Sequence, residues 1–106
     1  MPTFVFSYRM PKDYVPGGAD TMAAWAAWFD SMGANLTDRG KPVFETTGLG
    51  NCGGDTALGG YSFVTAEDLE SAVGLAKGSP ALDAGGGVEV GAVMALNLDS
   101  ASSGRG

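Results

Sequence analysis

The chain has 106 residues, of which 44% are apolar, and its twelve acidic and six basic side chains give a net charge of −6. This length and composition predict one small globular domain and exclude an intrinsically disordered chain. The six cations are scattered, so we expect no nucleic acid partner, which would need clustered Lys and Arg. No apolar run approaches the ~20 residues of a membrane span, so we expect no membrane partner.

The residue types that are missing also narrow the chemistry. The sequence contains no histidine, which removes the commonest general base and the commonest metal ligand. With Cys52 as the single cysteine, the chain cannot supply a usual zinc site or a Ser-His-Asp or Cys-His arrangement. We therefore expect no metal and no cofactor. One cysteine permits no internal disulfide, so the expected compartment is the reducing cytoplasm.

The N-terminal half predicts a strand, a loop, a helix and a second strand. Residues 3–9 alternate in polarity, as a strand does, and the Pro and Gly residues within 10–18 predict a loop. A helix beginning at Asp20 or Thr21 is expected to bury an apolar stripe with Trp28 at its margin. The stripe contains Met22, Trp25, Phe29, Met32 and Leu36. Residues 41–47 (KPVFETT) are the candidate second strand.

The C-terminal half reads as loop, strand, helix and strand. The glycine-dense residues 48–54 predict a loop, and a third strand is expected over 58–64. Thr65 is the expected cap of a second helix, with Asp68 completing a variant of the capping box, and Gly78 and Pro80 end that helix. Alternating apolar residues predict a last strand over 88–96. The expected domain covers residues 1–96, and residues 97–106 are the expected disordered tail.

This order of elements is β-α-β-β-α-β. It predicts an α+β, ferredoxin-like subunit, in which a four-stranded antiparallel sheet carries both helices on one face. The last strand is apolar on both sides, and one layer of helices covers only one of them. A second copy of the sheet is the expected cover for the other side, so the pattern predicts a homodimer.

Four segments of the C-terminal half resemble the YCII-related (DGPF) family. They are LGGY at 58–61, DLESA at 68–72, PAL at 80–82 and GVEV at 87–90. The resemblance implies a dimeric α+β barrel with a cleft between helices and sheet. The Asp-Gly-Pro-Phe motif of the family is missing here. When the chain is aligned with the family on LGGY, the position of the motif's aspartate falls near Gly48, within the glycine-dense loop. A few members resemble lyases or isomerases of small cyclic compounds, and without the motif only the fold and the cleft are carried over.

Six residues are candidate ligand contacts. Tyr8 and Arg9 end the first strand, where a hydroxyl and a cation could hold an anionic ligand, or could instead cap the core and be solvated. Trp28 is expected to line a pocket or meet a partner subunit, although its helical spacing also suits core packing. The remaining three candidates are Trp25, Asn51 and Tyr61, of which Asn51 also suits a turn and Tyr61 also suits the core.

Two carboxylates are candidate acid or base groups. Asp55 lies near the expected mouth of the cleft, and Glu89 lies on the outer side of the last strand, where Arg9 is its expected partner if it is buried. Cys52 lacks a neighbouring group that would activate its thiol. The sequence leaves three hypotheses open: a small-molecule binding protein, a cofactor-independent lyase or isomerase, and a non-catalytic structural or interaction module.

Overall fold

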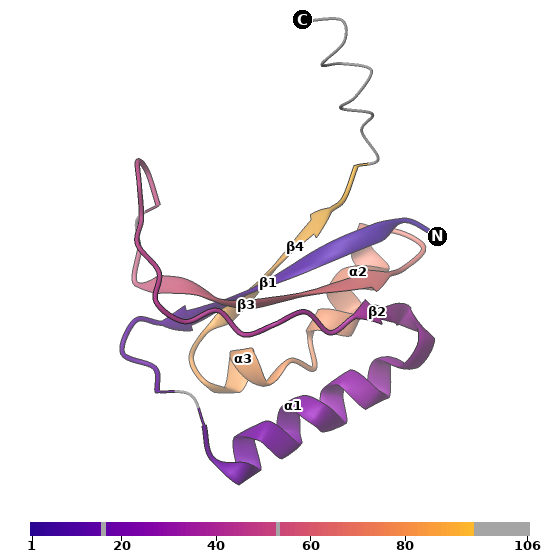
Figure 1. Ribbon diagram of the computed structural model, residues 1–106. Coiled ribbons are helices and arrows are strands. Elements are labelled where there is room, and N and C mark those ends of the chain that lie inside the picture. The colour runs from indigo at the N-terminus through magenta and orange to yellow at the C-terminus, as the bar shows by residue number, and fades with distance from the viewer. Residues whose placement is uncertain (16, 53, 95–106) are drawn as a thin grey trace, which may run out of the picture.

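A computed structural model of the chain describes residues 1–15, 17–52 and 54–94. Its elements are β1 (Thr3–Pro11), α1 (Ala19–Met32), the 3-10 helix η1 (Gly33–Asn35), β2 (Leu36–Asp38), β3 (Thr56–Thr65), α2 (Leu69–Ala76), α3 (Pro80–Asp83) and β4 (Gly87–Ala92). The strands form one antiparallel sheet in the order β2-β3-β1-β4, with the helices on one face (Figure 1). The ferredoxin-like α+β fold predicted from the sequence is confirmed. The expected tail at 97–106 lies outside the described residues.

The core lies between the sheet and the helices, and β1 is its centre. The even-numbered side chains from Phe4 to Met10 are buried under the helices, whereas the odd-numbered ones from Val5 to Arg9 are half-buried on the other face. This strict alternation follows from the two-residue period of a strand. β1 pairs with both neighbours and runs on to Pro11, two residues beyond the predicted end at Arg9.

The buried stripe of α1 is centred on Trp28, which corrects the sequence prediction. Trp28 and Met32 are buried, Trp25 and Phe29 pack against them, and Met22 is 69% exposed. The four packed residues follow the i, i+3, i+4, i+7 spacing of one helix face. Met22 lies outside the core because the first turns of α1 diverge from the sheet (Figure 1).

The second strand is shorter and earlier than the predicted 41–47. β2 follows η1 directly and pairs with β3, Leu36 opposite Val64, with a register shift before Asp38. Further along, only an isolated bridge joins Pro42 to Gly60. Proline has no N–H to donate, so a regular ladder cannot continue through this position.

The helices after β3 also differ from the prediction. Asp68, rather than Thr65, caps α2, and its carboxylate accepts a hydrogen bond of 2.8 Å from the Ser71 N–H. A further short helix, α3, follows, with the Ser79 hydroxyl accepting from the Ala81 N–H. β4 ends at Ala92, and the predicted strand end at Leu96 lies outside the described residues. The Ser79-Pro80 pair is a start signal for a helix, because proline is tolerated in the first turn.

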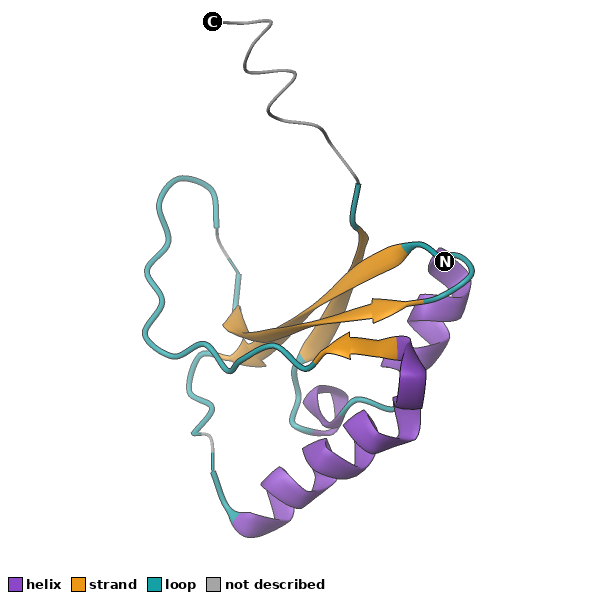
Figure 2. Ribbon diagram, turned by 45° about the vertical axis from the view of Figure 1, so that its right-hand side comes forward, coloured by secondary structure: helices purple, strands orange, loops and turns teal. Residues whose placement is uncertain are grey.

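The opposite face of the sheet carries no helix (Figure 2). Val5 of β1 lies opposite Phe63 of β3 and Gly91 of β4, and Ser7 lies opposite Tyr61. The Tyr61 and Phe63 rings pack edge to face with centroids 6.0 Å apart. Tyr61 therefore belongs to this helix-free face and not to the core. We use the name helix-free face for Val5, Ser7, Tyr61, Phe63, Glu89 and Gly91.

Candidate functional site

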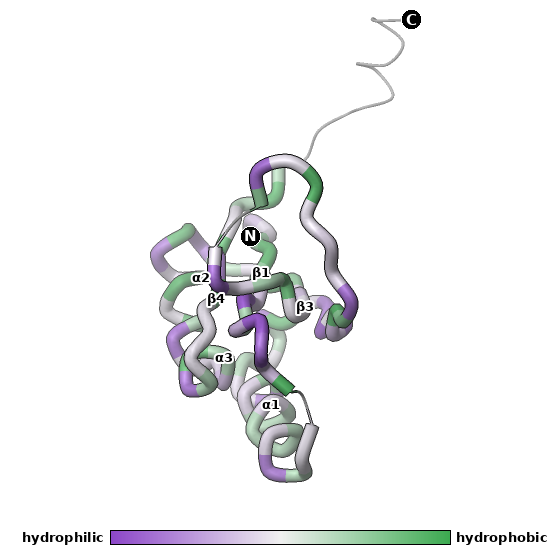
Figure 3. Tube along the Cα trace, turned by 90° about the vertical axis from the view of Figure 1, so that its left-hand side faces the viewer, coloured by the Kyte–Doolittle hydropathy of each residue, from purple (hydrophilic) through white to green (hydrophobic). Residues whose placement is uncertain are grey.

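A long loop, residues 43–52, forms the middle of the connection from β2 to β3. Backbone hydrogen bonds of 3.3 Å from Tyr61 to Lys41 and 3.1 Å from Val43 to Gly59 hold its start against β3. Beyond Val43 the loop arches away from the sheet (Figures 1 and 2), with apolar and polar stretches along it (Figure 3). It thereby leaves a space between itself and the ends of β1 and β3.

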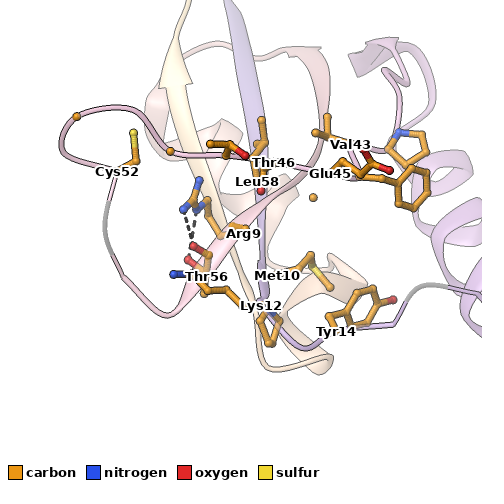
Figure 4. A pocket seen from close by; sticks show the side chains of 18 residues that line it. Arg9, Met10, Lys12, Tyr14, Val43, Glu45, Thr46, Cys52, Thr56 and Leu58 are labelled. Carbon is orange, nitrogen blue, oxygen red and sulfur yellow. Dashed lines mark hydrogen bonds between the residues drawn. The ribbon is translucent and has the colours of Figure 1, made fainter.

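That space is a groove with a volume of about 970 Å³. Its floor comes from β1 and β3, and its outer wall comes from the long loop (Figure 4). Cationic, phenolic and apolar side chains line it together, among them Arg9, Met10, Lys12, Tyr14, Val43 and Leu58. We call it the loop groove. Such a mixture of apolar walls and a few polar groups is typical of small-molecule sites.

Arg9 is fixed in the loop groove by a single residue, Thr56. The Arg9 Nε donates to the Thr56 Oγ1 at 3.3 Å, and its Nη2 donates to the Thr56 carbonyl oxygen at 2.9 Å. Arg9 lies next to a register shift between Tyr8 and Arg9 in the pairing of β1 with β3. The extra residue at this shift, Gly59, belongs to β3, and Arg9 keeps the alternation of β1.

A second hollow of about 620 Å³ shares Arg9, Cys52 and Thr56 with the first. Asn51 and Glu89 line it as well, so the structure brings together three residues predicted as site residues: Arg9, Asn51 and Glu89. Glu89 is exposed, and no salt bridge joins it to Arg9 within the described ranges, where the pairing of Arg39 with Asp30 at 3.2 Å is the only one. The structure therefore does not form the buried ion pair between Glu89 and Arg9 that the sequence offered as one alternative.

Three aromatic candidates, Tyr8, Trp25 and Trp28, pack in the core, and Tyr61 lies on the helix-free face. None of the four lines either hollow. Tyr8 is 4% exposed, and its ring packs edge to face against Trp25 at 4.8 Å and Trp28 at 5.8 Å. The Trp28 Nε1 donates to the Leu75 carbonyl oxygen at 3.1 Å, which satisfies its polar atom inside the core. The expected cleft between helices and sheet is thus filled by aromatic rings, and the open space lies at the long loop instead.

The buried Tyr8 phenol is held in a short chain of hydrogen bonds. Its hydroxyl donates to the Ser62 Oγ at 2.7 Å, and Ser62 donates to the Arg39 carbonyl oxygen at 2.6 Å. Burial raises the pKa of Tyr8 to about 12, and the hydrogen bond with Ser62 offsets part of that rise. The phenol therefore stays neutral at physiological pH and ties β1 to the segment before the long loop.

Asp55 and Cys52 are both exposed. Asp55 is exposed and lines neither of the two hollows, and its backbone carbonyl accepts from the Lys12 N–H at 3.3 Å. The exposed Cys52 thiol donates to the Leu49 carbonyl oxygen at 3.2 Å. Among the residues that the structure describes, no three His, Cys, Asp or Glu side chains gather into a metal site.

Of the residues that line the loop groove, Arg9 was predicted as a ligand contact, whereas Lys12, Tyr14 and Thr56 were among those that were not. Lys12 and Tyr14 follow the end of β1, and two of the six cations of the chain, Arg9 and Lys12, fall within four residues there. That local concentration of positive charge was the available signal. Thr56 had none, because its approach to Arg9 depends on the pairing of β1 with β3.

No protein-family model matches the chain, and no curated protein matches it. Within the described residues, no helix is long and apolar enough to cross a membrane. A similar solved structure is 5-chloro-2-hydroxyhydroquinone dehydrochlorinase from Burkholderia phenoliruptrix in complex with 2,5-dihydroxybenzoquinone, with a TM-score of 0.55 and 22% sequence identity. The similarity covers 92% of this chain and 97% of the dehydrochlorinase chain. It supports the fold over nearly the whole chain, and at this identity it supports the fold alone.

Proposed function

We propose that this protein binds a small organic molecule in the loop groove. The observation that carries the proposal is the lining of the groove, which combines the polar residues Arg9, Lys12 and Tyr14 with the apolar residues Met10, Val43 and Leu58. A space of about 970 Å³ has room for a ligand of drug-like size. Among the residues predicted from the sequence, Arg9 belongs to this site, and Asn51 and Glu89 extend it toward β4.

The binding unit is a homodimer in this proposal, formed by the helix-free faces of two copies. Val5 and Phe63 lie side by side on that face with no helix over them, and Gly91 leaves the surface beside Val5 flat. Apolar surface of this kind gains free energy when it is covered. The resemblance to the YCII-related family implies the same pairing. With a single cysteine and no internal disulfide, we place the dimer in the reducing cytoplasm.

A second candidate function is that of a lyase or isomerase without a cofactor. It is favoured by the second hollow, where the exposed Glu89 carboxylate could move a proton beside the Arg9 cation. The dehydrochlorinase of similar fold acts, by its name, on a small aromatic compound. Release of chloride from 5-chloro-2-hydroxyhydroquinone by the wild type, and its loss in Glu89→Gln, would support this reading. Equal rates with and without protein would contradict it for this substrate.

Native mass spectrometry on freshly purified protein, followed by NMR, tests the binding proposal. A dimer that retains an extra mass would support it and give the mass of the ligand. In the NMR experiment, a mixture of small organic fragments is expected to shift the backbone amides of Lys12, Val43 and Leu58. The Ala72 amide of α2, buried on the far side of the core, is expected to stay unchanged. Shifts that avoid the loop groove would contradict the proposal.

A further inference from the structure

We propose that the ligand of the loop groove is an organic anion with an apolar body. Arg9 binds its acidic group, and Thr56 is the positioning residue that orients Arg9. This inference rests on the proposed function, because it names the class of ligand for the same groove. It also gives a role to Thr56, which no sequence pattern indicated.

The charge of the groove lining is opposite in sign to that of the whole chain. The chain as a whole carries a net charge of −6, yet the groove lining contains two cations, Arg9 and Lys12, and one carboxylate, Glu45. Two positive charges and one negative charge leave the lining of the loop groove with a net charge of +1, to which Glu89 does not contribute because it lines the second hollow. Since the field of the whole molecule repels anions, a positive groove is a local and selective feature.

The charge of Arg9 has no ionic partner among the residues that the structure describes. Within the described parts of the chain, the salt bridge is formed by Arg39 with Asp30, and both of those side chains are mostly exposed. Arg9 is held instead by two neutral oxygen atoms of Thr56, at 3.3 and 2.9 Å. Because these acceptors are uncharged, they fix the orientation of the guanidinium without neutralising its positive charge. That charge therefore stays available for an anion.

The Arg9 guanidinium also keeps hydrogens that Thr56 does not use. Thr56 occupies the Nε and one Nη2 hydrogen of Arg9, so the Nη1 hydrogens and the second Nη2 hydrogen are left for another acceptor. These hydrogens form the fork that matches a carboxylate. Figure 4 shows the Arg9 head group beside Thr56, between the long loop and β3. An orientation fixed before binding lowers the entropy lost when the anion is bound.

The rest of the groove describes the body of the ligand. Met10, Val43 and Leu58 supply apolar walls, and Lys12 offers a second positive charge. An inorganic anion would leave these walls uncovered. A carboxylate or phenolate on an apolar ring or chain would fill the groove and meet the cations at once.

The test compares two acids with their neutral counterparts. Benzoate and cyclohexanecarboxylate are titrated against benzamide and cyclohexanecarboxamide, while ¹H–¹⁵N NMR follows the backbone amides and the arginine Nε–H signals. The sequence contains three arginines, Arg9, Arg39 and Arg105, so the Arg9 signal can be assigned from its loss in Arg9→Gln. We expect at least one acid to shift the Arg9 signal and to bind about tenfold or more tightly than its amide.

Matched variants separate charge from position. Arg9→Gln is expected to weaken binding of the acid about tenfold or more and to leave the amide unaffected, whereas Arg39→Gln, the control, changes neither. Thr56→Val keeps the carbonyl acceptor and the shape but removes the Oγ1. Thr56→Val is expected to weaken binding of the acid about threefold to tenfold, whereas Thr56→Ser, which keeps the hydroxyl, is expected to bind the acid as the wild type does.

The possible failures are distinguishable. If acids and amides bind the loop groove equally, or if Arg9→Gln behaves like Arg39→Gln, the anion inference is wrong and the binding proposal stands. If Thr56→Val and Thr56→Ser weaken binding alike, Thr56 has no positioning role. If neither the acids nor the amides shift the groove amides, both the proposed function and this inference are contradicted.

Discussion

Among single residues, Tyr8 has the most altered chemistry. Its folded-state pKa of about 12 lies above the ordinary value of 10.0, because burial disfavours the phenolate. The stability linked to this raised pKa is complete below pH 10.0 and is lost as the pH rises toward about 12. We expect the free energy of unfolding to fall by about 2 kcal/mol over this window because of Tyr8. Urea titrations at several alkaline pH values, followed by tryptophan fluorescence, measure the fall.

Tyr8→Phe removes the phenol and should flatten this alkaline fall. At neutral pH the variant should lose about 1 kcal/mol, the contribution of one buried hydrogen bond, while Ser62 keeps its bond to the Arg39 carbonyl oxygen. Tyr61→Phe is the control, because it removes a phenol from the helix-free face and leaves Tyr8 intact. An alkaline fall as steep in Tyr8→Phe as in the wild type would show that other groups cause it.

Among the elements, α2 depends on its cap. The hydrogen bond from the Ser71 N–H lowers the pKa of Asp68 below 3.8, so its contribution is present above that pH and is lost as the pH falls through the lower folded value. Asp68→Ala should therefore destabilise the protein at neutral pH, and the difference from the wild type should shrink in acid. Urea unfolding at pH 7 and below pH 3.8 measures this difference. Glu67→Ala is the control, and an equal loss in both variants would contradict the capping role.

The segment before the long loop depends on Gly40. Its φ is +70°, and a methyl group added there would overlap the Tyr61 carbonyl oxygen. Gly50, with a φ of +76°, has open space around it and is the matched control. We expect Gly40→Ala to lose more than ~2 kcal/mol of unfolding free energy, and Gly50→Ala to lose about 1 kcal/mol from the backbone alone. Equal losses in urea titrations would mean that the approach to Tyr61 contributes nothing.

The same elements explain how far the sequence could predict the structure. β1 and the run through β3, α2 and β4 carry clear alternation and helix signals, and these sufficed for the fold. β2 was misplaced because it is only three residues long and follows η1 directly, so the helix period of α1 absorbs Leu36. In the site, Arg9 could be predicted from its place near the end of a strand. Its contact with Thr56 could not, because it depends on the register of β1 against β3.

On the scale of the whole molecule, the two faces of the sheet are unequal. One face is closed by α1 and α2 around the stacked rings of Phe6 and Trp28, whose centroids are 6.0 Å apart. The other face presents Val5 and Phe63 with no layer above them. This face also carries the polar side chains of Ser7 and Glu89, but its apolar residues have no cover from the chain itself. This imbalance is the physical reason for the proposed homodimer.

Reversing the character of the helix-free face should therefore separate the copies. We expect the wild type to sediment as a dimer at micromolar concentration and Phe63→Lys to sediment as a folded monomer, because a buried ammonium ion without a partner is costly. Met22→Lys is the control, since Met22 is 69% exposed on α1, away from that face. It should remain a dimer. A wild type that sediments as a monomer, or a Phe63→Lys variant that stays dimeric, would mean that the helix-free face is not the interface.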